Sequence, residues 1–404
     1  MRKLPPVGTR LHGDELWAAL RAGSTAPDDL CAKLSERIPS EKVYLFGSGR
    51  AALAALLTAT SRLDARKRVI VPAYTCWSVP AAIVRAGLIV TPAEITPGTL
   101  DYDLERLARL DWKDVLAVVS PNLFGLPGDL TRLQGLAEAH DALMIDDAAQ
   151  ALGASLRGFP VGGYGLAGIL SFGRGKNITA LGGGAALVRD ESIQKAMDEM
   201  ADEFRGEPAP PGILAAMKGL AMGAALSPSV YGLASAMPGV VVGRTVYEPQ
   251  FATPAMGNAR AALASRVLDR LDAINQRRGQ LAEVLDRFLE QSKAIVLPKA
   301  RSGAVPAWLR RPLLVIDVTL RDELIEALQA AGIGATAMYP QPVHKIPGIE
   351  GDLDLRGAPF DGAERVAESL IALPLVEGMT KQDLETIART IAKLLGRKRM
   401  SQWA

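Results

Sequence analysis

The sequence predicts an α/β fold in which helices cover both faces of a mostly parallel, seven-stranded sheet, followed by a smaller α+β domain. Up to about residue 190, short apolar runs alternate with segments of helical pattern. Strands that are apolar throughout are buried on both faces, and strands that alternate with helices pair in parallel. The seven runs are Val43–Phe46, Val69–Val71, Leu88–Val90, Val115–Val119, Leu143–Ile145, Ile169–Phe172 and Ala185–Val188.

A second group of strands and helices follows residue 250. Ala255–Ser292 has the pattern of one long helix, and threonine and aspartate stand at capping distance at the start of two later helices. We expect a large domain over residues 1–250 and a small domain over 251–404. The later elements are the strands Leu313–Val318, Ala335–Tyr339 and Leu370–Leu375 and the helices Thr319–Ala331 and Thr380–Leu395.

Composition excludes several classes of protein. Lysine and arginine number 46 against 44 acidic residues, a net charge of +2, so we expect no nucleic-acid partner. The two cysteines form no disulfide framework, and residues 1–15 lack the apolar core of a signal peptide, so a cytoplasmic location is expected. The three histidines lie far apart and have no metal-ligand spacing, which predicts no metal site.

An apolar insert occupies about residues 211–245. Its stretch from Gly219 to Gly243 contains no charged residue and is long enough to span a bilayer. Pro228 and Pro238 interrupt it, which disfavours a spanning helix. We expect a buried or interface-covering helical pair, in preference to contact with a membrane surface.

The first candidate site follows the strand Val43–Phe46, where Gly47-Ser48-Gly49-Arg50-Ala51-Ala52 opens a helix. Small residues at a helix N-terminus let backbone amides approach an anion, which predicts a phosphate site. The same letters fit the GxGxxA dinucleotide fingerprint, but the next strand, Val69–Val71, is followed by no acid for a ribose. A tight turn without a ligand remains an alternative.

Two further strand ends carry charged groups. Asp146 and Asp147 follow Leu143–Ile145, and one of them can pair with a cationic ring nitrogen, although helix capping would also explain an aspartate there. Lys176 follows the run Ile169–Phe172 in a loop bordered by glycines. A surface lysine is the alternative. A phosphate site, a ring-nitrogen acid and a lysine amine at neighbouring strand ends are what pyridoxal phosphate (PLP) requires.

The segments SGRAAL (48–53), VPAYT (71–75), IDDAAQALGA (145–154) and SFGRGKNITALGGGAAL (171–187) resemble the DegT-type (DegT/DnrJ/StrS) sugar aminotransferases. The resemblance continues weakly at 339–344 and 372–380. It implies a PLP enzyme of fold type I that acts as a homodimer. Such an enzyme moves an amino group from an amino acid, with glutamate expected, to a keto-sugar that is linked to a nucleotide.

By the same resemblance, Lys176 is the Schiff-base lysine and proton carrier, and Asp147 pairs with the pyridine nitrogen. Gln150 lies near the ring hydroxyl. The phosphate would be held by Ser171 and by the helix start at Gly49, Arg50 and Ala51. Arg50 replaces the family's more usual threonine and adds a positive charge.

The chain also departs from the family pattern. Cys76 stands where the family has an aromatic residue stacked on the ring, and we expect Trp77, one position later, to take that role. The alternative is that Cys76 packs at that place and Trp77 belongs to the core. Gln250 stands in place of an asparagine that reaches the partner's phosphate. His344 lies where the family lines its acceptor pocket and is a candidate substrate-binding residue, with a polar loop histidine as the alternative.

Three other functions remain open. A PLP lyase or dehydratase is disfavoured because the family's dehydratases carry histidine at the position of Lys176. A dehydrogenase could use Gly47–Ala52 to bind NAD(P). A non-catalytic protein on the same fold would retain the cofactor site without an active acceptor site.

Overall fold

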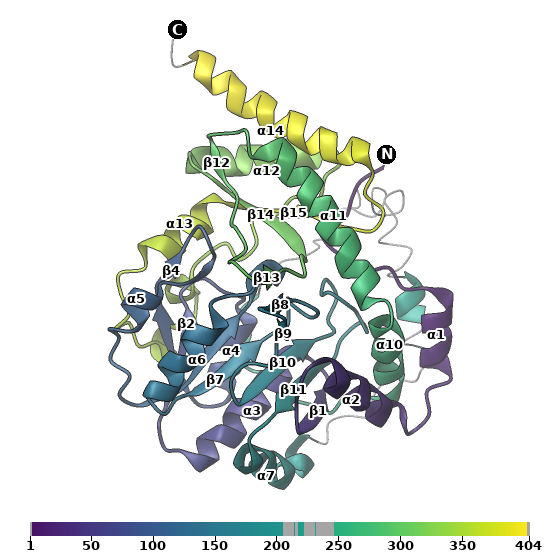
Figure 1. Cartoon of the computed structure of the whole chain (residues 1–404), viewed down its shortest axis with the longest axis vertical. Coiled ribbons are helices and arrows are strands. Elements are labelled where there is room, and N and C mark those ends of the chain that lie inside the picture. The colour runs from purple at the N-terminus through teal and green to yellow at the C-terminus, as the bar shows by residue number, and fades with distance from the viewer. Residues whose placement is uncertain (1, 205–213, 215–216, 222–230, 232–245, 402–404) are drawn as a thin grey trace.

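The computed structural model describes residues 2–204, 214, 217–221, 231 and 246–401 (Figure 1). Its centre is a seven-stranded sheet with the order β1-β11-β10-β7-β6-β2-β3. Only β11 runs antiparallel to its neighbours, so the predicted, mostly parallel sheet is confirmed with all seven strands. The strands are β1 Lys42–Phe46, β2 Arg68–Pro72, β3 Ile89–Ala93, β6 Val115–Pro121, β7 Leu143–Asp147, β10 Ala167–Ser171 and β11 Gly184–Val188.

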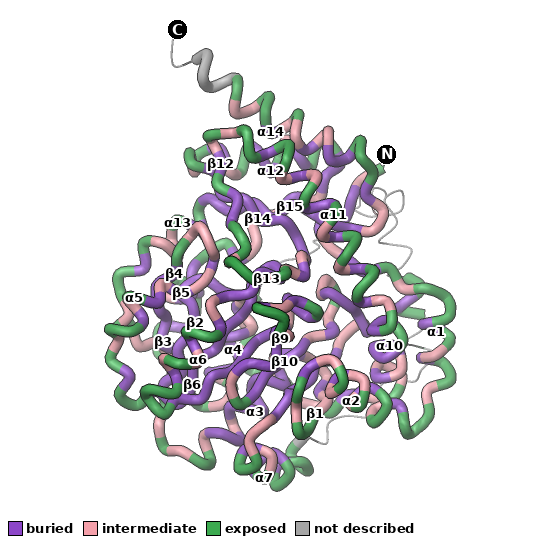
Figure 2. Tube along the Cα trace, viewed as in Figure 1, coloured by how far each residue is buried: buried purple, intermediate pink, exposed green. Residues whose placement is uncertain are grey.

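Helices cover both faces of this sheet because successive strand residues point to opposite sides. In β2, Val69 and Val71 join one apolar cluster with α3 and α4, whereas Ile70 joins a second cluster with α2, α6 and α10. Figure 2 shows the strands buried between the two layers. The helices of the large domain are α1 Gly13–Leu20, α2 Ala26–Arg37, α3 Gly49–Leu63, α4 Ser78–Arg85, α5 Leu104–Leu107, α6 Leu130–Ala139, α7 Glu191–Glu199 and α10 Asn258–Leu268.

Short strands and single-turn helices lie between the longer elements along the whole chain. The short strands are β4 Ile95–Thr96, β5 Asp101–Tyr102, β8 Ser155–Leu156, β9 Phe159–Pro160 and β13 Ala304–Val305. The single-turn helices are η1 Leu123–Gly125, η2 Ala201–Phe204, η3 Val318–Leu320, η4 Val343–Lys345 and η5 Glu350–Asp352.

A second sheet, with three antiparallel strands in the order β12-β14-β15, lies above the large sheet (Figure 1). In β14, Leu313 and Val315 pack into a third apolar cluster with α11, α12 and α14, whereas Leu314 joins the first cluster of the large domain. One face of β14 therefore points toward the large domain. The elements are β12 Ile295–Val296, β14 Arg310–Val315, β15 Leu370–Pro374, α11 Leu271–Leu289, α12 Arg321–Ala330, α13 Asp361–Ser369 and α14 Lys381–Ser401.

The structure corrects two expectations in this half. The predicted helix Ala255–Ser292 is broken between α10 and α11, where Arg270 is fixed by an ion pair with Glu15 (2.7 Å). The predicted strand Ala335–Tyr339 forms only one bridge, between Thr336 and Ala372. The strand cannot continue because Met338 and Tyr339 adopt positive φ angles of 23° and 42°.

Of the two predicted threonine caps, the one at Thr380 is confirmed and the one at Thr319 is wrong. Thr380 and Asp383 form the predicted reciprocal cap at the start of α14, with Thr380 N–H to Asp383 at 2.7 Å and Asp383 N–H to Thr380 at 3.3 Å. The Thr319 cap was a wrong expectation, because Asp317 accepts the Thr319 N–H (3.1 Å) and begins η3 instead.

The division of the chain at residue 250 stays a prediction. Two segments cross it: α10 packs on α1 and α2, and Leu4 packs in the third cluster with its N–H bonded to the Gly332 carbonyl (2.7 Å). Most of the apolar insert at 211–245 lies outside the described residues. Among the helices of the described residues, none has the length and apolar character needed to cross a membrane.

Gly125 lies where η1 contacts the segment that precedes β14. It has a φ of 84°, accepts the Ala307 N–H at 3.0 Å, and an added Cβ would stand 2.0 Å from the Ala307 carbonyl oxygen. We expect Gly125→Ala to lower the free energy of unfolding by more than about 2 kcal/mol. The control is Gly135→Ala in exposed α6, where nothing lies near the new methyl group, and we expect it to add about 0.5–1 kcal/mol. Denaturant unfolding measures both, and equal stabilities would contradict this account of the junction.

Candidate active site

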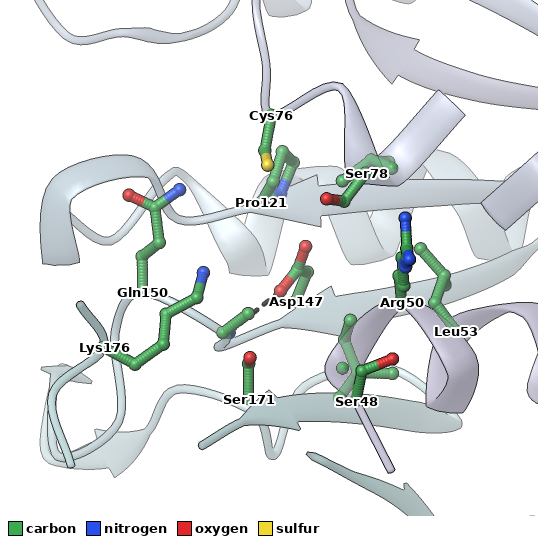
Figure 3. A pocket seen from close by; sticks show the side chains of 14 residues that line it. Ser48, Arg50, Leu53, Cys76, Ser78, Pro121, Asp147, Gln150, Ser171 and Lys176 are labelled. Atoms are coloured by element: carbon green, nitrogen blue, oxygen red, sulfur yellow. Dashed lines mark hydrogen bonds between the residues drawn. The ribbon is translucent and has the colours of Figure 1, made fainter. Parts of the chain in front are cut away.

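A pocket of about 240 Å³ lies at the carboxyl ends of the central strands, beside the N-terminus of α3 (Figure 3). Ligands of open α/β sheets bind at this edge. The pocket brings together most of the site residues predicted from the sequence, which come from three separate segments. These residues are Gly49, Arg50, Asp147, Gln150, Ser171 and Lys176.

The two adjacent aspartates of β7 point to opposite sides. Asp146 accepts hydrogen bonds from Asn122 Nδ2 (2.8 Å) and from the backbone N–H groups of Gly162 (2.5 Å) and Tyr164 (3.2 Å), outside the pocket. Asp147 lines the pocket and accepts the Ala149 N–H at 2.9 Å. Asp146 thus stabilises the fold, and Asp147 is available to a ligand.

Asp147 is a carboxyl group in an environment that disfavours its charge. Burial raises its pKa to about 6, while the Ala149 N–H and the positive charge of Lys176 act in the opposite direction. A cation placed against this carboxyl group would restore its ionised form.

Lys176 extends into the pocket toward Asp147 and Gln150 (Figure 3). Its loop turns at Gly175, where φ is 81° and an added Cβ would meet Val7 at 2.8 Å. Glycine is therefore required at the turn that presents the lysine.

A buried polar network holds this loop from behind. The Thr9 hydroxyl donates to the carbonyls of Lys176 (3.3 Å) and Asn177 (3.0 Å), and Arg278 donates to Thr9 Oγ1 (3.0 Å) and to the Asn177 carbonyl (3.3 Å). Arg278 is fully buried, and burial lowers its pKa to about 10. The sequence analysis missed Thr9 and Arg278. An arginine within the apolar stripe of α11, between Ile274 and Leu281, was the available signal.

The opposite end of the pocket is the first turn of α3. Ser48 caps the helix by accepting the Ala51 N–H (3.2 Å), and a Cβ on Gly49 would stand 2.8 Å from Ser171 Cβ. Gly49, Arg50 and Ser171 line the pocket at this end, and their phosphate-binding role stays a prediction. Ala51 does not line the pocket, and its amide already bonds Ser48.

The guanidinium of Arg50, in this first turn of α3, is held by an acidic residue and an aromatic ring. Both of its terminal nitrogens donate to Glu248 Oε2 at 3.1 Å, and the group lies over the Phe251 ring with 4.4 Å to its centroid. Arg50 thus brings a positive charge to the pocket that is only partly neutralised by an exposed carboxylate.

The expectation that Trp77 faces the pocket is wrong. Cys76 lines the pocket, whereas Trp77 is buried in the first apolar cluster and donates its Nε1–H to the Gln341 carbonyl (3.2 Å). The indole cannot face the pocket because it is enclosed in the core at the start of α4. Gln150 continues this wall, accepting the Phe124 N–H (3.1 Å) and donating to the Tyr339 hydroxyl (3.0 Å).

His344 is not brought to the pocket of this chain. Its Nε2 lies 2.9 Å from Glu364 Oε1, and its ring packs on Phe360 with the centroids 4.7 Å apart. Its neighbour in the same motif, Tyr339, is the residue that reaches the pocket wall through Gln150. Residues 339–344 resemble the family, but only His344 among them was predicted as a site residue.

The sheet topology and this pocket define the class: the chain is an α/β protein of the PLP-enzyme type known as fold type I. It belongs to the DegT/DnrJ/EryC1/StrS aminotransferase family, whose model matches residues 25–209 and 246–392. The chain is therefore an aminotransferase, and aminotransferases of this family depend on PLP.

Three known proteins illustrate the relationship. The erythromycin biosynthesis sensory transduction protein EryC1 of Saccharopolyspora erythraea is 28% identical over 80% of this chain and 78% of its own length. The dTDP-3-amino-3,4,6-trideoxy-α-D-glucose transaminase of Streptomyces venezuelae is 27% identical over 76% of this chain and 71% of its own. The solved structure of Helicobacter pylori PseC, an aminotransferase of pseudaminic acid biosynthesis, superposes with a TM-score of 0.80 at 19% identity, covering 98% of this chain and all of PseC.

The raised pKa of Asp147 predicts a pH dependence of stability. A folded-state pKa of about 6 against an ordinary value near 3.8 means that the folded, cofactor-free protein loses stability as pH rises from about 4 through 6. We expect cofactor-free Asp147→Asn to be more stable than the parent at pH 8, by about 1–3 kcal/mol, and the difference to disappear near pH 4.

Asp146→Asn is the contrasting variant. Burial raises the pKa of Asp146 to about 6 as well, but both of its oxygens accept hydrogen bonds, Oδ2 from two backbone N–H groups and Oδ1 from Asn122 Nδ2. An amide nitrogen in place of Oδ1 would face the Asn122 donor, so we expect that substitution to destabilise the protein at pH 8 and at pH 4 alike. Thermal unfolding across pH measures both variants. A gain for Asp147→Asn that did not change with pH would contradict the assignment of the raised pKa.

Proposed function

We propose that this chain is a transaminase in which Lys176 binds PLP covalently and Asp147 pairs with its ring nitrogen. The amino donor is an amino acid, with glutamate expected, and the acceptor is a keto-sugar, expected to be linked to a nucleotide. The observation that carries the proposal is that Lys176 and Asp147 line one buried pocket whose far end is a helix N-terminus.

The residues present fit the shape and charge of the cofactor. The start of α3, with Gly49, Arg50 and Ser171 around it, suits a phosphate dianion, because helix N-termini and arginine both favour negative charge. Asp147 suits a protonated pyridine nitrogen, since its carboxyl group is buried and gains a cationic partner. When bound, PLP supplies an aldehyde and an electron-withdrawing ring that stabilise negative charge on the donor Cα.

The protein side chains then have separate tasks. With PLP bound, the Nζ amine of Lys176 would hold the cofactor and, once free, would accept the proton from the donor Cα, because it is the amine that extends into the pocket. Asp147 would keep the ring nitrogen protonated. Gln150, which is fixed between Phe124 and Tyr339, would orient the bound ring.

Support for the sugar acceptor comes from the relatives. The Streptomyces venezuelae enzyme is a transaminase of a dTDP-linked aminosugar, and a related enzyme of Acidithiobacillus ferrooxidans is a UDP-N-acetyl-3-dehydro-α-D-glucosamine 3-aminotransferase. A homodimer and a cytoplasmic location remain part of the proposal. His344 does not line the pocket of its own chain, so a substrate-binding role for it would require the pocket of another subunit.

The Schiff base gives the sharpest test. The purified protein should show the absorbance of a lysine-linked cofactor, and borohydride should fix that cofactor onto a peptide containing Lys176. Lys176→Ala should lose the band and at least about 1,000-fold in amino-transfer rate, because the amine is both the anchor and the proton carrier. A Lys176→Ala variant with an unchanged spectrum would refute the assignment.

The acceptor is tested separately. The pyridoxamine form of the enzyme is incubated with a panel of nucleotide-linked keto-sugars, and return of the aldehyde absorbance identifies an acceptor. Cofactor that cycles with glutamate but with no keto-sugar of the panel would contradict the sugar assignment and leave the transaminase assignment intact. Cofactor that is bound but cycles with no amino donor would indicate a non-catalytic protein.

A further inference from the structure

Lys176 lies on a segment that has no helix or strand of its own. This segment runs from the end of β10 at Ser171 to the start of β11 at Gly184, and all of its residues are described. Its base is closed by the Ala180 N–H, which donates to the Phe172 carbonyl at 2.8 Å, but the peptide of Lys176 lies several residues from that bond. The position of the lysine amine therefore depends on what else holds the segment.

Thr9 holds the peptide groups next to the lysine. Its buried hydroxyl donates to the carbonyls of Lys176 (3.3 Å) and Asn177 (3.0 Å). The same hydroxyl oxygen accepts a hydrogen bond from Arg278 Nη2 (3.0 Å). A hydroxyl has one proton and two lone pairs. Because the arginine occupies a lone pair, the proton is directed at the two carbonyls, and Arg278 thereby fixes the direction of the bond that holds the lysine loop.

Arg278 carries a charge that its surroundings disfavour. It is fully buried, and burial lowers its pKa to about 10, so it stays charged at neutral pH. The charge of Glu377 favours the guanidinium, but that carboxylate pairs with Arg270 at 3.6 Å. Within the described part of the chain, the hydrogen bonds of Arg278 go to neutral oxygens of Gly8, Thr9, Asn177 and Leu375. Apolar side chains often replace buried charges without loss of stability, so stability alone does not account for this arginine.

The network acts on the pocket only through the lysine. Lys176 lines the pocket, whereas Thr9 and Arg278 do not. Asp147 has a support of its own, the Ala149 N–H at 2.9 Å. Loss of the network would therefore displace the lysine amine and leave the carboxyl group in place.

We propose that Thr9 and Arg278 are positioning residues that set the place of the Lys176 amine for proton transfer. This rests on the proposed function, in which Nζ takes the proton of the donor: the Cα–H bond breaks, an N–H bond forms, and the electron pair stays with the donor carbon. Such a transfer requires a short distance and a fixed orientation, and a misplacement of about 1 Å costs about 100-fold in rate. Binding of the donor and of the cofactor depends on other groups.

The test removes one hydroxyl group. Thr9→Val deletes the donor to the two carbonyls, and Thr9→Ser keeps it. Thr60→Val is the matched control, because the Thr60 hydroxyl is also buried and also donates to a backbone carbonyl, that of Leu56 (2.9 Å), near the far end of α3. Arg278→Lys keeps the charge but lacks the fork that makes several bonds at once, and it decides the question if Thr9→Val does not fold. Circular dichroism and thermal unfolding establish which holoenzymes are folded.

Hydrogen exchange of the cofactor-free protein reports on the loop directly. We expect Thr9→Val and Arg278→Lys to raise the exchange of backbone amides in peptides that cover residues 173–180 by about 10-fold, the effect of one lost hydrogen bond. Thr9→Ser and Thr60→Val should leave that exchange within about twofold of the parent. Unchanged exchange in Thr9→Val would mean that the hydroxyl does not hold the loop, and the proposal would be overturned.

Stopped-flow spectra of the donor half-reaction test the consequence for catalysis. We expect the limiting rate constant with L-glutamate to fall roughly 10- to 100-fold in Thr9→Val and about 10-fold in Arg278→Lys. The glutamate concentration for half-saturation and the affinity for PLP should change less than about threefold, because the groups that bind them are unchanged. The isotope effect of glutamate deuterated at Cα should be at least as large as in the parent, since proton transfer is the step that slows.

Thr9→Ser should recover the parent rate to within about threefold, and Thr60→Val should leave it unchanged. A smaller isotope effect in Thr9→Val, or equal losses in rate, glutamate binding and cofactor affinity, would indicate a general loosening of the pocket and overturn the proposal.

The two proposals fail in different ways. If the parent protein lacked the lysine-linked cofactor band, the proposed function would fall, while hydrogen exchange would still report whether Thr9 holds the loop. If the parent turned over with glutamate and Thr9→Val did so at the same rate, only the positioning role of Thr9 and Arg278 would be lost.

Discussion

A carboxyl group buried at the end of β7 constrains the design of the whole pocket. Asp147 is held where ionisation is disfavoured, so the pocket has to supply a cation at that place whenever the carboxylate form is needed. Lys176 approaches from one side and the first turn of α3 lies beyond (Figure 3). The aspartate next to it, Asp146, faces the other side of the strand and is held by backbone amides, which keeps the orientation of Asp147 fixed.

The small domain contributes to this pocket by holding its walls from outside. Arg278 on α11 donates to the Asn177 carbonyl, Thr9 of the N-terminal segment donates to the carbonyls of Lys176 and Asn177, and Tyr339 fixes Gln150. Each of these contacts joins residues more than 100 positions apart in the chain. Asp147 lies at a strand end and Lys176 in the loop after one, but their surroundings depend on side chains from distant parts of the chain.

How much of this site the sequence could predict depends on whether a residue is marked by a local pattern or by contacts with distant parts of the chain. Strand runs and the residues after them are local signals, so the sheet, the aspartate pair and the lysine loop could be predicted from them. The choice of Asp147 and Lys176 for their roles came from the resemblance to the family. The contacts of Arg278 and Tyr339 with the pocket wall and the lysine loop join distant parts of the chain, and no local pattern encodes them. Trp77 shows the limit most clearly: one position along the chain separates a pocket residue, Cys76, from an indole enclosed in the core.

The N-terminal segment has a consequence for handling this protein. Arg2 pairs with Asp383 at the start of α14, Leu4 bonds Gly332, and Thr9 reaches the carbonyls of the lysine loop. These few residues form a strap that runs from the last helix to the turn presenting Lys176. A start site chosen a dozen codons downstream would therefore remove the contacts of this strap with α14 and with the loop of Lys176.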